Sequence, residues 1–201
     1  MFALFRRCAL VFLCCHTLTT SATTILAPSF LELVSESEWV GRGVVRSVRT
    51  EEFDSPQGRG IRTIVEFEVE RTLRGPARAT VTLVQLGGTA GGRTLRVLGL
   101  PDFQPGQRQI AFVARNGHVI CPVVRGAYGR FLVHADGATG RESVVRDDGA
   151  PLLSLDQVAL PLAGRLVAPS LLGRGAGMSL AEFETRIVAV AAQVPVSITR
   201  P

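Results

Sequence analysis

Hydrophobic and polar residues alternate most clearly in the segment 65–70 (VEFEVE), where valine and phenylalanine alternate with three glutamates. A period of two is typical of a β-strand with one buried and one exposed face. Charged residues are ordinary on the exposed face of an antiparallel strand, where neighbouring arginines can neutralise them, so we do not interpret the glutamates as a cation site or an acid/base pair. The pattern therefore predicts a half-buried strand over 61–73.

Short β-rich runs separated by glycine, proline and aspartate continue from about residue 40 to residue 146, a pattern typical of an all-β barrel or sandwich. Asn116-Gly117 is the strongest hairpin signal in the chain, and it predicts that the run IAFVAR pairs with the run HVICPVV. The predicted strands are 43–49, 61–73, 79–86, 94–98, 107–115, 118–124, 130–135 and 143–146.

Helical periodicity is found near the two ends of the chain. The segment 29–35 (SFLELVS) is apolar on one side and predicts a brief helix. Ser179 and Glu182 have the spacing of a capping box, and apolar residues recur after them at helical spacing. We therefore predict an amphipathic helix over 179–195 that packs on the β-domain; a membrane-surface helix is the alternative, which its single arginine disfavours. The segment 151–178, with three prolines, is interpreted as an irregular connector.

The first 22 residues have the pattern of a secretory signal peptide. The pair Arg6-Arg7 is followed by the apolar run 8–15 and by a stretch of small and polar residues that ends at Ala22. The apolar run is far shorter than the roughly 20 residues of a membrane-spanning helix, so no permanent membrane span is expected. We predict cleavage after Ala22, export to the periplasm or beyond the cell, and a β-domain over 23–150.

The basic residues narrow the chemistry that the chain can perform. All 22 of them are arginine, because no lysine occurs in the sequence. This excludes Walker-type phosphate binding, Schiff-base chemistry and lysine general bases. The formal net charge of +5 becomes +3 without Arg6 and Arg7, and the remaining arginines are spread among acidic residues. We therefore expect no nucleic-acid partner.

Cysteine and histidine are too few for a thiolate metal site. Three of the four cysteines lie within 1–22, so only Cys121 is expected in the mature chain, without an intramolecular disulfide. Its apolar neighbours favour a buried cysteine that acts as a small hydrophobic residue; pairing between chains or a reactive thiol is the alternative. His118 and His134 do not complete a set of zinc ligands. We expect neither a metal nor a cofactor.

A glycine cluster provides the candidate binding loop. The segment 87–92 (GGTAGG) lies between two predicted strands and lacks the lysine of a P-loop, so it matches neither nucleotide-binding fingerprint. Inter-strand loops nevertheless carry binding function more often than cores do. Tyr128, the only tyrosine, is either an exposed contact or a core ring whose hydroxyl reaches the surface. The predicted partner-binding residues are Gly87, Gly88, Thr89, Gly91, Gly92 and Tyr128.

The predicted N-terminal helix is followed by WVGRGVVRSVRTE, IRTIVEFEVERTLRG, TVTLVQLGGTAGG, VLGLPDFQPGQRQIAFVARN and VVRGAYGRFLV. Over about residues 30–146 this order resembles uncharacterised secreted bacterial proteins of the netrin and tissue-inhibitor-of-metalloproteinase type. The resemblance implies an OB-like β-barrel. Together with the two helices predicted above, the expected fold is mainly β: a single antiparallel, OB-like β-barrel with a short N-terminal helix and a C-terminal amphipathic helix. Inhibitors of that family chelate the zinc of their target through an N-terminal cysteine, and disulfides brace their barrel. This chain departs on both points, because its predicted mature N-terminus is Thr23 and Cys121 has no partner.

Three functional hypotheses follow. The first, which we take as the prediction, is an exported, non-catalytic β-barrel protein that binds a protein or envelope component through its loops. The second, an inhibitor or accessory factor of a secreted protease, comes from the resemblance alone. The third is a small hydrolase that uses Cys121 or a serine with His118 or His134, for which the sequence contains no nucleophile-elbow motif.

Overall fold

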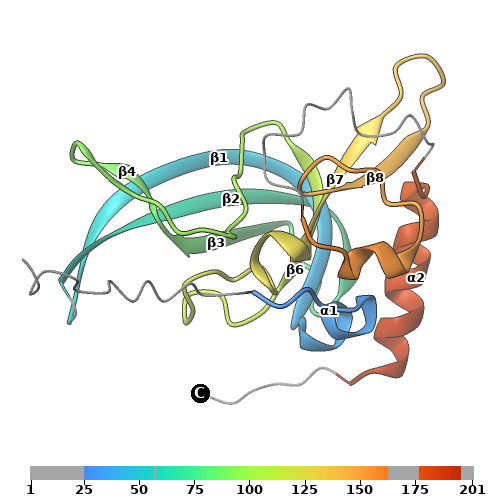
Figure 1. The fold of residues 1–201 in the computed structure, drawn as a ribbon, viewed down its shortest axis with the longest axis horizontal. Helices are drawn as coiled ribbons and strands as arrows, with labels where there is room; N and C mark the ends of the chain where they lie inside the picture. The colour runs from blue at the N-terminus through green and yellow to red at the C-terminus, as the bar shows by residue number, and fades with distance from the viewer. Residues whose placement is uncertain (1–24, 57, 163–176, 196–201) are drawn as a thin grey trace, which may run out of the picture.

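The computed structural model describes residues 25–56, 58–162 and 177–195, so the predicted signal peptide and residues 163–176 of the predicted connector lie outside the described residues. One large antiparallel sheet has the strand order β3-β2-β1-β6-β7-β8, and β4 pairs with β5 in a separate hairpin (Figure 1). The prediction of a mainly β, antiparallel fold is confirmed. The strands are β1 (Trp39–Ser55), β2 (Gly58–Arg74), β3 (Thr80–Leu86), β4 (Gly88–Ala90), β5 (Arg93–Leu95), β6 (Arg108–Val113), β7 (Arg130–Ala135) and β8 (Glu142–Arg146).

Two α-helices and two short 3₁₀ helices accompany the sheet. They are α1 (Phe30–Glu36), η1 (Gly126–Gly129), η2 (Leu155–Ala159) and α2 (Leu180–Gln193). At the start of α2, the hydroxyl of Ser179 accepts a hydrogen bond from the backbone N–H of Glu182 at 3.2 Å. The complete capping box is found at α1, between Ser29 and Glu32. In the described ranges, neither helix has the length and apolar character needed to cross a membrane.

The sheet is open, so the prediction of a closed barrel is wrong for the described residues. Its edge strands β3 and β8 do not pair with each other. Other segments occupy the free edge of β8: the backbone N–H of Leu152 donates to the carbonyl of Val144 at 3.1 Å, and the N–H of Val144 donates to the carbonyl of Met178 at 3.0 Å. An edge strand whose backbone groups are satisfied in this way does not need a closing strand.

The free edge of β3 is covered by the loop that follows β6. The side chain of Asn116 accepts a hydrogen bond from the N–H of Val84 at 3.1 Å and donates one to the carbonyl of Thr82 at 2.6 Å. The carbonyl of Ile120 accepts a hydrogen bond from the N–H of Leu86 at 2.7 Å. A single amide side chain therefore takes the place of a peptide group of a neighbouring strand.

This use of Asn116 explains why the hairpin predicted across 116–117 forms only in part. Val113 and Val123 make an isolated antiparallel bridge, but 118–124 forms no strand. The loop turns toward β3 instead of closing tightly on β6. Asn116-Gly117 does lie in a turn, as the sequence predicts. The sequence does not reveal that the side chain of Asn116 caps β3.

Strand β1 joins the two halves of the sheet. Residues 40–44 pair with both β2 and β6, whereas the rest of β1 up to Ser55 pairs with β2 and extends with it as a long curved hairpin (Figure 1). A Cβ atom on Gly41 would lie 2.2 Å from the ring of Trp39, and a Cβ atom on Gly43 would lie 2.0 Å from the backbone carbonyl oxygen of Glu68. The missing side chains allow the indole to lie on the strand and allow β2 to approach closely.

The two faces of the sheet bury separate hydrophobic clusters. On β6, Ile110 and Phe112 belong to the cluster that α1, α2 and η2 cover, whereas Ala111 and Val113 belong to the cluster that contains Trp39. Strand β6 is therefore buried on both faces, which explains its continuous apolar run. Aromatic rings contribute to both clusters through the pairs Phe112–Phe131, Phe131–Phe183 and Trp39–Phe67.

Two of the three glutamates of the alternating segment pair with arginines of neighbouring strands, and the third, Glu66, accepts a hydrogen bond from the hydroxyl of Ser47 at 2.9 Å. Glu70 pairs with Arg42 at 2.8 Å and with Arg108 at 2.7 Å, and Glu68 pairs with Arg46. These contacts cross from β2 to β1 and β6. They support the interpretation that arginines neutralise this strand face, in preference to a cation site.

Helix α2 is held on the sheet by arginine contacts at its middle and its end. The carboxylate of Glu184, which is 3% exposed, pairs with Arg42 at 2.5 Å and with Arg71 at 2.6 Å. The buried Arg74 donates to the carbonyl of Val194 at 3.0 Å, just past the C-terminus of the helix. An α-helix leaves its last carbonyls unpaired, and a cation also interacts favourably with the negative end of the helix dipole.

We expect the substitution Gly43→Ala to lower the free energy of unfolding by at least about 2 kcal/mol, because the new methyl group meets a backbone carbonyl that cannot move without breaking the β1–β2 pairing. Gly137→Ala is the matched control, since no atom lies within 4 Å of a Cβ there, and its effect should stay below about 1 kcal/mol. Urea denaturation of the two variants measures the difference. Equal stability of both would show that the close approach is not a constraint.

Candidate functional site

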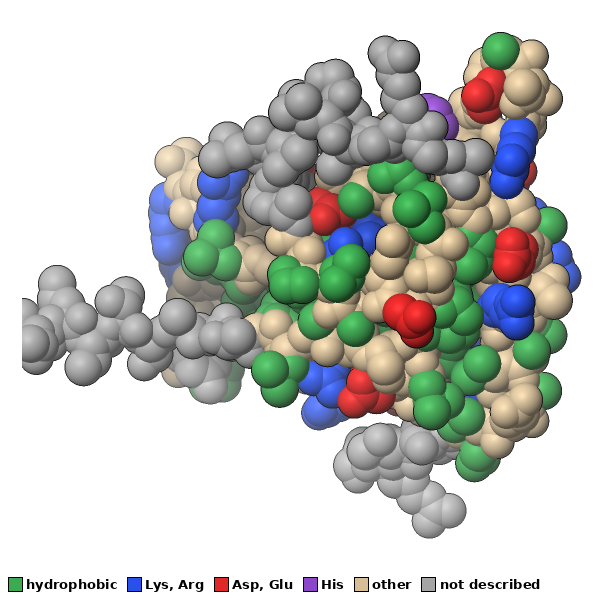
Figure 2. Space-filling model, turned by 45° about the vertical axis from the view of Figure 1, so that its right-hand side comes forward, with side chains coloured by type: hydrophobic (Ala, Val, Ile, Leu, Met, Phe, Trp, Pro, Cys, Tyr) green, Lys and Arg blue, Asp and Glu red, His purple; other side chains and the backbone are tan. Residues whose placement is uncertain are grey.

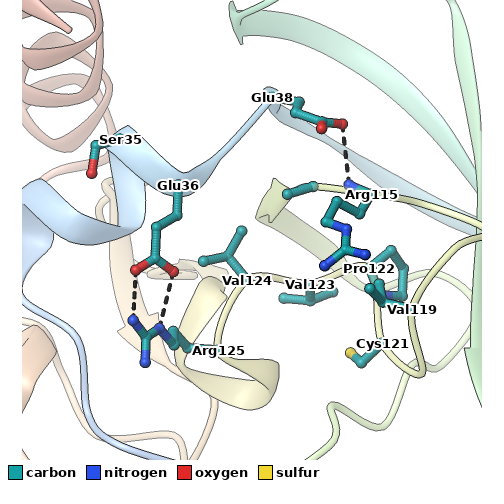
Figure 3. A pocket seen from close by; sticks show the side chains of 11 residues that line it. Ser35, Glu36, Glu38, Arg115, Val119, Cys121, Pro122, Val123, Val124 and Arg125 are labelled. Atoms are coloured by element: carbon teal, nitrogen blue, oxygen red, sulfur yellow. Dashed lines mark hydrogen bonds and ion pairs between the residues drawn. The ribbon is translucent and has the colours of Figure 1, made fainter. Parts of the chain in front are cut away.

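An open cleft lies between the C-terminal end of α1 and the loop that follows β6. Its volume is about 600 Å³, and we call it the α1 cleft (Figure 3). One wall comes from residues 35–38 and the other from residues 114–125, so segments far apart in the sequence form a single site. The lining residues are Ser35, Glu36, Glu38, Ala114, Arg115, Val119, Cys121, Pro122, Val123, Val124 and Arg125.

Local hydrogen bonds fix both walls of the α1 cleft. Beyond the end of α1, the hydroxyl of Ser37 donates to the carbonyl of Leu33 at 2.6 Å, and the N–H of Glu38 donates to the carbonyl of Val113 at 2.9 Å. The opposite wall is held by the hydrogen bond from the N–H of Ala114 to the carbonyl of Pro122, also 2.9 Å long. The cleft is therefore built on the junction of β1 and β6, which the sheet makes rigid.

Two arginines of the cleft have an unusual backbone conformation. Arg115 has φ = 50° and Arg125 has φ = 54°, and among the described residues they are the only non-glycine residues with positive φ. A left-handed conformation costs a residue with a side chain roughly 1–2 kcal/mol. Such strain persists where the surrounding contacts determine the conformation, and it is concentrated at functional sites. Two strained arginines in one cleft therefore mark it as the strongest candidate site.

Arg125 is neutralised within the cleft. Its guanidinium makes a two-pronged contact with the carboxylate of Glu36, with N–O distances of 3.0 and 2.6 Å (Figure 3). Hydrogen bonding to this carboxylate raises the pKa of Arg125 above its ordinary value. The pair shows that the cleft accommodates a carboxylate in the fork of a guanidinium.

Arg115 is held by its backbone, and its side chain is left available. Its N–H donates to Oε2 of Glu38 at 3.1 Å, while its side chain turns away from Glu38 toward Pro122 (Figure 3). Within the described part of the chain, its guanidinium has no ion-pair or hydrogen-bond partner. Valine and proline side chains line the cleft beside it. The arrangement suits an anionic oxygen group attached to an apolar body.

Cys121 also lines the cleft, but it is not prepared to act as a nucleophile. Burial raises the pKa of its thiol to about 11, and the thiol donates a weak hydrogen bond to Oε1 of Gln85 at 3.9 Å. The thiolate is the reactive form, so the thiol is inert near neutral pH. His118 lies in the exposed turn after β6 and His134 near the exposed end of β7, and no hydrogen bond joins either to Cys121 in the described chain.

The predicted glycine loop is a small hairpin. Gly87 precedes β4, which contains Gly88 and Thr89, and Gly91-Gly92 forms the two-residue turn to β5. Both turn glycines have positive φ, 55° and 72°, as a type I′ turn requires. The hairpin is anchored to the long β1–β2 hairpin, where the hydroxyl of Thr63 donates to the carbonyl of Gly87 at 2.7 Å. The glycines therefore allow tight packing, and the loop is not an open one.

Tyr128 lies in a different part of the fold from this hairpin. It belongs to η1, which contacts β6 and β7, whereas β4 contacts β1, β2 and β5. The predicted binding residues are therefore split between two regions. The cleft residues Glu36, Glu38, Arg115 and Arg125 were not predicted from the sequence, where no pattern distinguishes them from the other arginines and glutamates. The residue pair Asn116-Gly117 was the nearest signal, because it marks the turn that begins at Arg115.

The chain matches no protein-family model and no curated protein. The site is therefore interpreted from its own chemistry. Within residues 25–56, 58–162 and 177–195, no group of three His, Cys, Asp or Glu side chains could hold a metal ion. The expectation that the protein uses no metal or cofactor remains a prediction.

We expect alkylation of Cys121 by iodoacetamide to be slow at pH 8 and to increase through a midpoint near pH 11, because the folded protein holds the thiol protonated until then. Peptide mass spectrometry measures the rate at this cysteine alone, and circular dichroism verifies the fold at each pH. In guanidinium chloride the midpoint should fall to about 8.5, the ordinary value for cysteine. A midpoint at or below about 8.5 in the folded protein would contradict the effect of burial on this thiol.

Proposed function

We propose that this chain is an exported, non-catalytic β-sheet protein that binds a protein partner through the α1 cleft. The observation that carries the proposal is the guanidinium of Arg115, which lies in the cleft without a partner among the described residues. Its neighbour Arg125 is already satisfied by Glu36. A strained backbone that presents an unpaired guanidinium beside apolar side chains is more useful for recognition than for stability.

The surroundings of the cleft have the composition of a protein interface. Arginine is enriched among the residues that dominate binding energies, and apolar side chains surround them in such interfaces. Ile120, adjacent to Cys121 in the cleft wall, is 58% exposed. The face shown in Figure 2 carries hydrophobic side chains between acidic and basic ones, without one prevailing charge. This favours a protein partner over nucleic acid, which requires a basic surface.

Export and the identity of the partner are parts of the same proposal. The N-terminal pattern of paired arginines, an apolar run and small residues supports export to the periplasm or beyond the cell. The resemblance to the netrin and metalloproteinase-inhibitor type suggests an alternative, in which the partner is a secreted protease. The predicted mature N-terminus lacks the zinc-chelating cysteine of those inhibitors, so the α1 cleft is the better candidate for contact with any partner.

Capture of partners from the native envelope or secreted fraction tests the proposal. We expect Arg115→Ala to reduce the recovery of partner proteins at least about tenfold, as loss of a central interface arginine does. Arg141→Ala is the matched control, because Arg141 is also exposed but lies in the loop between β7 and β8. Quantitative mass spectrometry compares the two variants with the unmodified protein.

The result is interpretable only if both variants are folded, which thermal denaturation establishes. If Arg115→Ala recovers the same proteins in the same amounts as Arg141→Ala, the α1 cleft is not the docking site. If the unmodified protein itself recovers no partner above an unrelated exported control, the binding function is wrong.

A further inference from the structure

We propose that the α1 cleft binds an extended peptide segment of the partner through an acidic side chain, whose carboxylate pairs with the guanidinium of Arg115. This inference rests on the proposed function and specifies its ligand. Charge complementarity is its first basis, because a guanidinium fork matches the two oxygens of a carboxylate. In the described residues, no carboxylate of the chain occupies this fork.

The cleft already contains one contact between a guanidinium and a carboxylate, that of Arg125 with Glu36. The carboxylate of Glu36 meets both prongs of the guanidinium, at 3.0 and 2.6 Å. The chain thus supplies one carboxylate for one of its two cleft arginines. Arg115, on the opposite side of the loop formed by 115–125, is the corresponding guanidinium without an internal carboxylate.

Glu38 restricts the ligand to a peptide and disfavours a compact anion. Its carboxylate accepts the backbone N–H of Arg115, and in the described chain it makes no ion pair with an arginine. This carboxylate repels a phosphate with two negative charges more strongly than it repels a carboxylate with one. A peptide carries a single carboxylate together with N–H donors, which Glu38 can accept. Its apolar residues can contact Val119, Pro122 and Val123 in the same cleft.

Hydrogen bonds of the neighbouring backbone fix the point from which the Arg115 side chain leaves the loop. The residues on both sides of Arg115 are engaged elsewhere: the N–H of Ala114 donates to Pro122, and the side chain of Asn116 is bound to β3. With its own N–H on Glu38, Arg115 has little freedom to change φ from 50°. Preorganisation of this kind lowers the entropic cost of binding.

The test measures binding of labelled pentapeptides by fluorescence anisotropy. The first has blocked ends and a central glutamate flanked by valines, the second has glutamine in place of the glutamate, and the third is the glutamine peptide with a free C-terminal carboxylate. We expect the glutamate peptide to bind roughly tenfold more tightly than the glutamine peptide, as a charge-assisted pair predicts. Arg115→Ala should make the affinities for the glutamate and glutamine peptides equal, and Arg141→Ala should preserve the difference between them.

The variant Arg115→Lys distinguishes the contribution of the planar guanidinium donors from that of the positive charge. Lysine keeps the positive charge but lacks the planar pair of donors, so we expect it to restore only a small part of the discrimination between glutamate and glutamine. Any of four results would overturn the proposal. The first two are equal affinity for these two peptides and tighter binding of the peptide with the free C-terminus. The other two are no measurable binding of the glutamate peptide at millimolar concentration and a ratio of affinities that Arg115→Ala leaves unchanged.

The two proposals fail in different ways. If partner capture does not depend on Arg115, the α1 cleft is not the docking site and both proposals are wrong. If capture depends on Arg115 but an excess of the glutamate peptide does not compete with the partner, the docking site stands and the acidic ligand is wrong.

Discussion

The large sheet and the α1 cleft both rely on the close packing of β1 at Gly41 and Gly43. Residues 40–44 of β1 connect the strands β3 and β2 on one side with β6, β7 and β8 on the other. A side chain at residue 43 would meet the carbonyl of Glu68. A side chain at residue 41 would displace the indole of Trp39, which packs against Phe67 in the core. The α1 cleft begins at the same junction, so its geometry depends on these glycines as well.

Arginine side chains make ion pairs and hydrogen bonds that attach the helix and loops to the sheet, since the sequence contains no lysine. Arg42 and Arg71 meet the buried Glu184 of α2, and Arg74 binds backbone carbonyls at the end of the same helix. Arg130, which is almost fully buried, donates to the carbonyl of Asp102 at 2.7 Å and also pairs with Asp147. A guanidinium has five donors in a rigid plane and can satisfy several acceptors at once, which an ammonium group does less well. The composition is thus suited to a sheet whose helix and loops are attached by buried polar contacts.

Among the described residues, the exposed arginines Arg78, Arg96 and Arg141 also lack a side-chain partner, but Arg115 differs from them because it lines the α1 cleft and has a positive φ. The arginines elsewhere in the sheet are engaged by carboxylates or backbone carbonyls, and Arg125 in the cleft follows the same rule through Glu36. The backbone N–H of Arg115 donates to the carboxylate of Glu38, and its side chain points into the cleft (Figure 3). Stability alone does not require a strained residue in this position, and the proposed recognition of a carboxylate would account for it.

The local structure could be predicted from the sequence alone. Alternation in 65–70 and the turn residues between the runs identified most strands, and helical spacing after Ser179 identified α2, because these patterns reflect contacts between residues close in the chain. The open sheet could not be predicted from the sequence, because Asn116 caps β3 at Val84 and Thr82, which lie 32 and 34 residues earlier in the chain. Only the tertiary structure brought residues 35–38 to residues 114–125 and set the positive φ of Arg115 and Arg125. Such pairings depend on the path of the whole chain through space, which no short window of sequence contains.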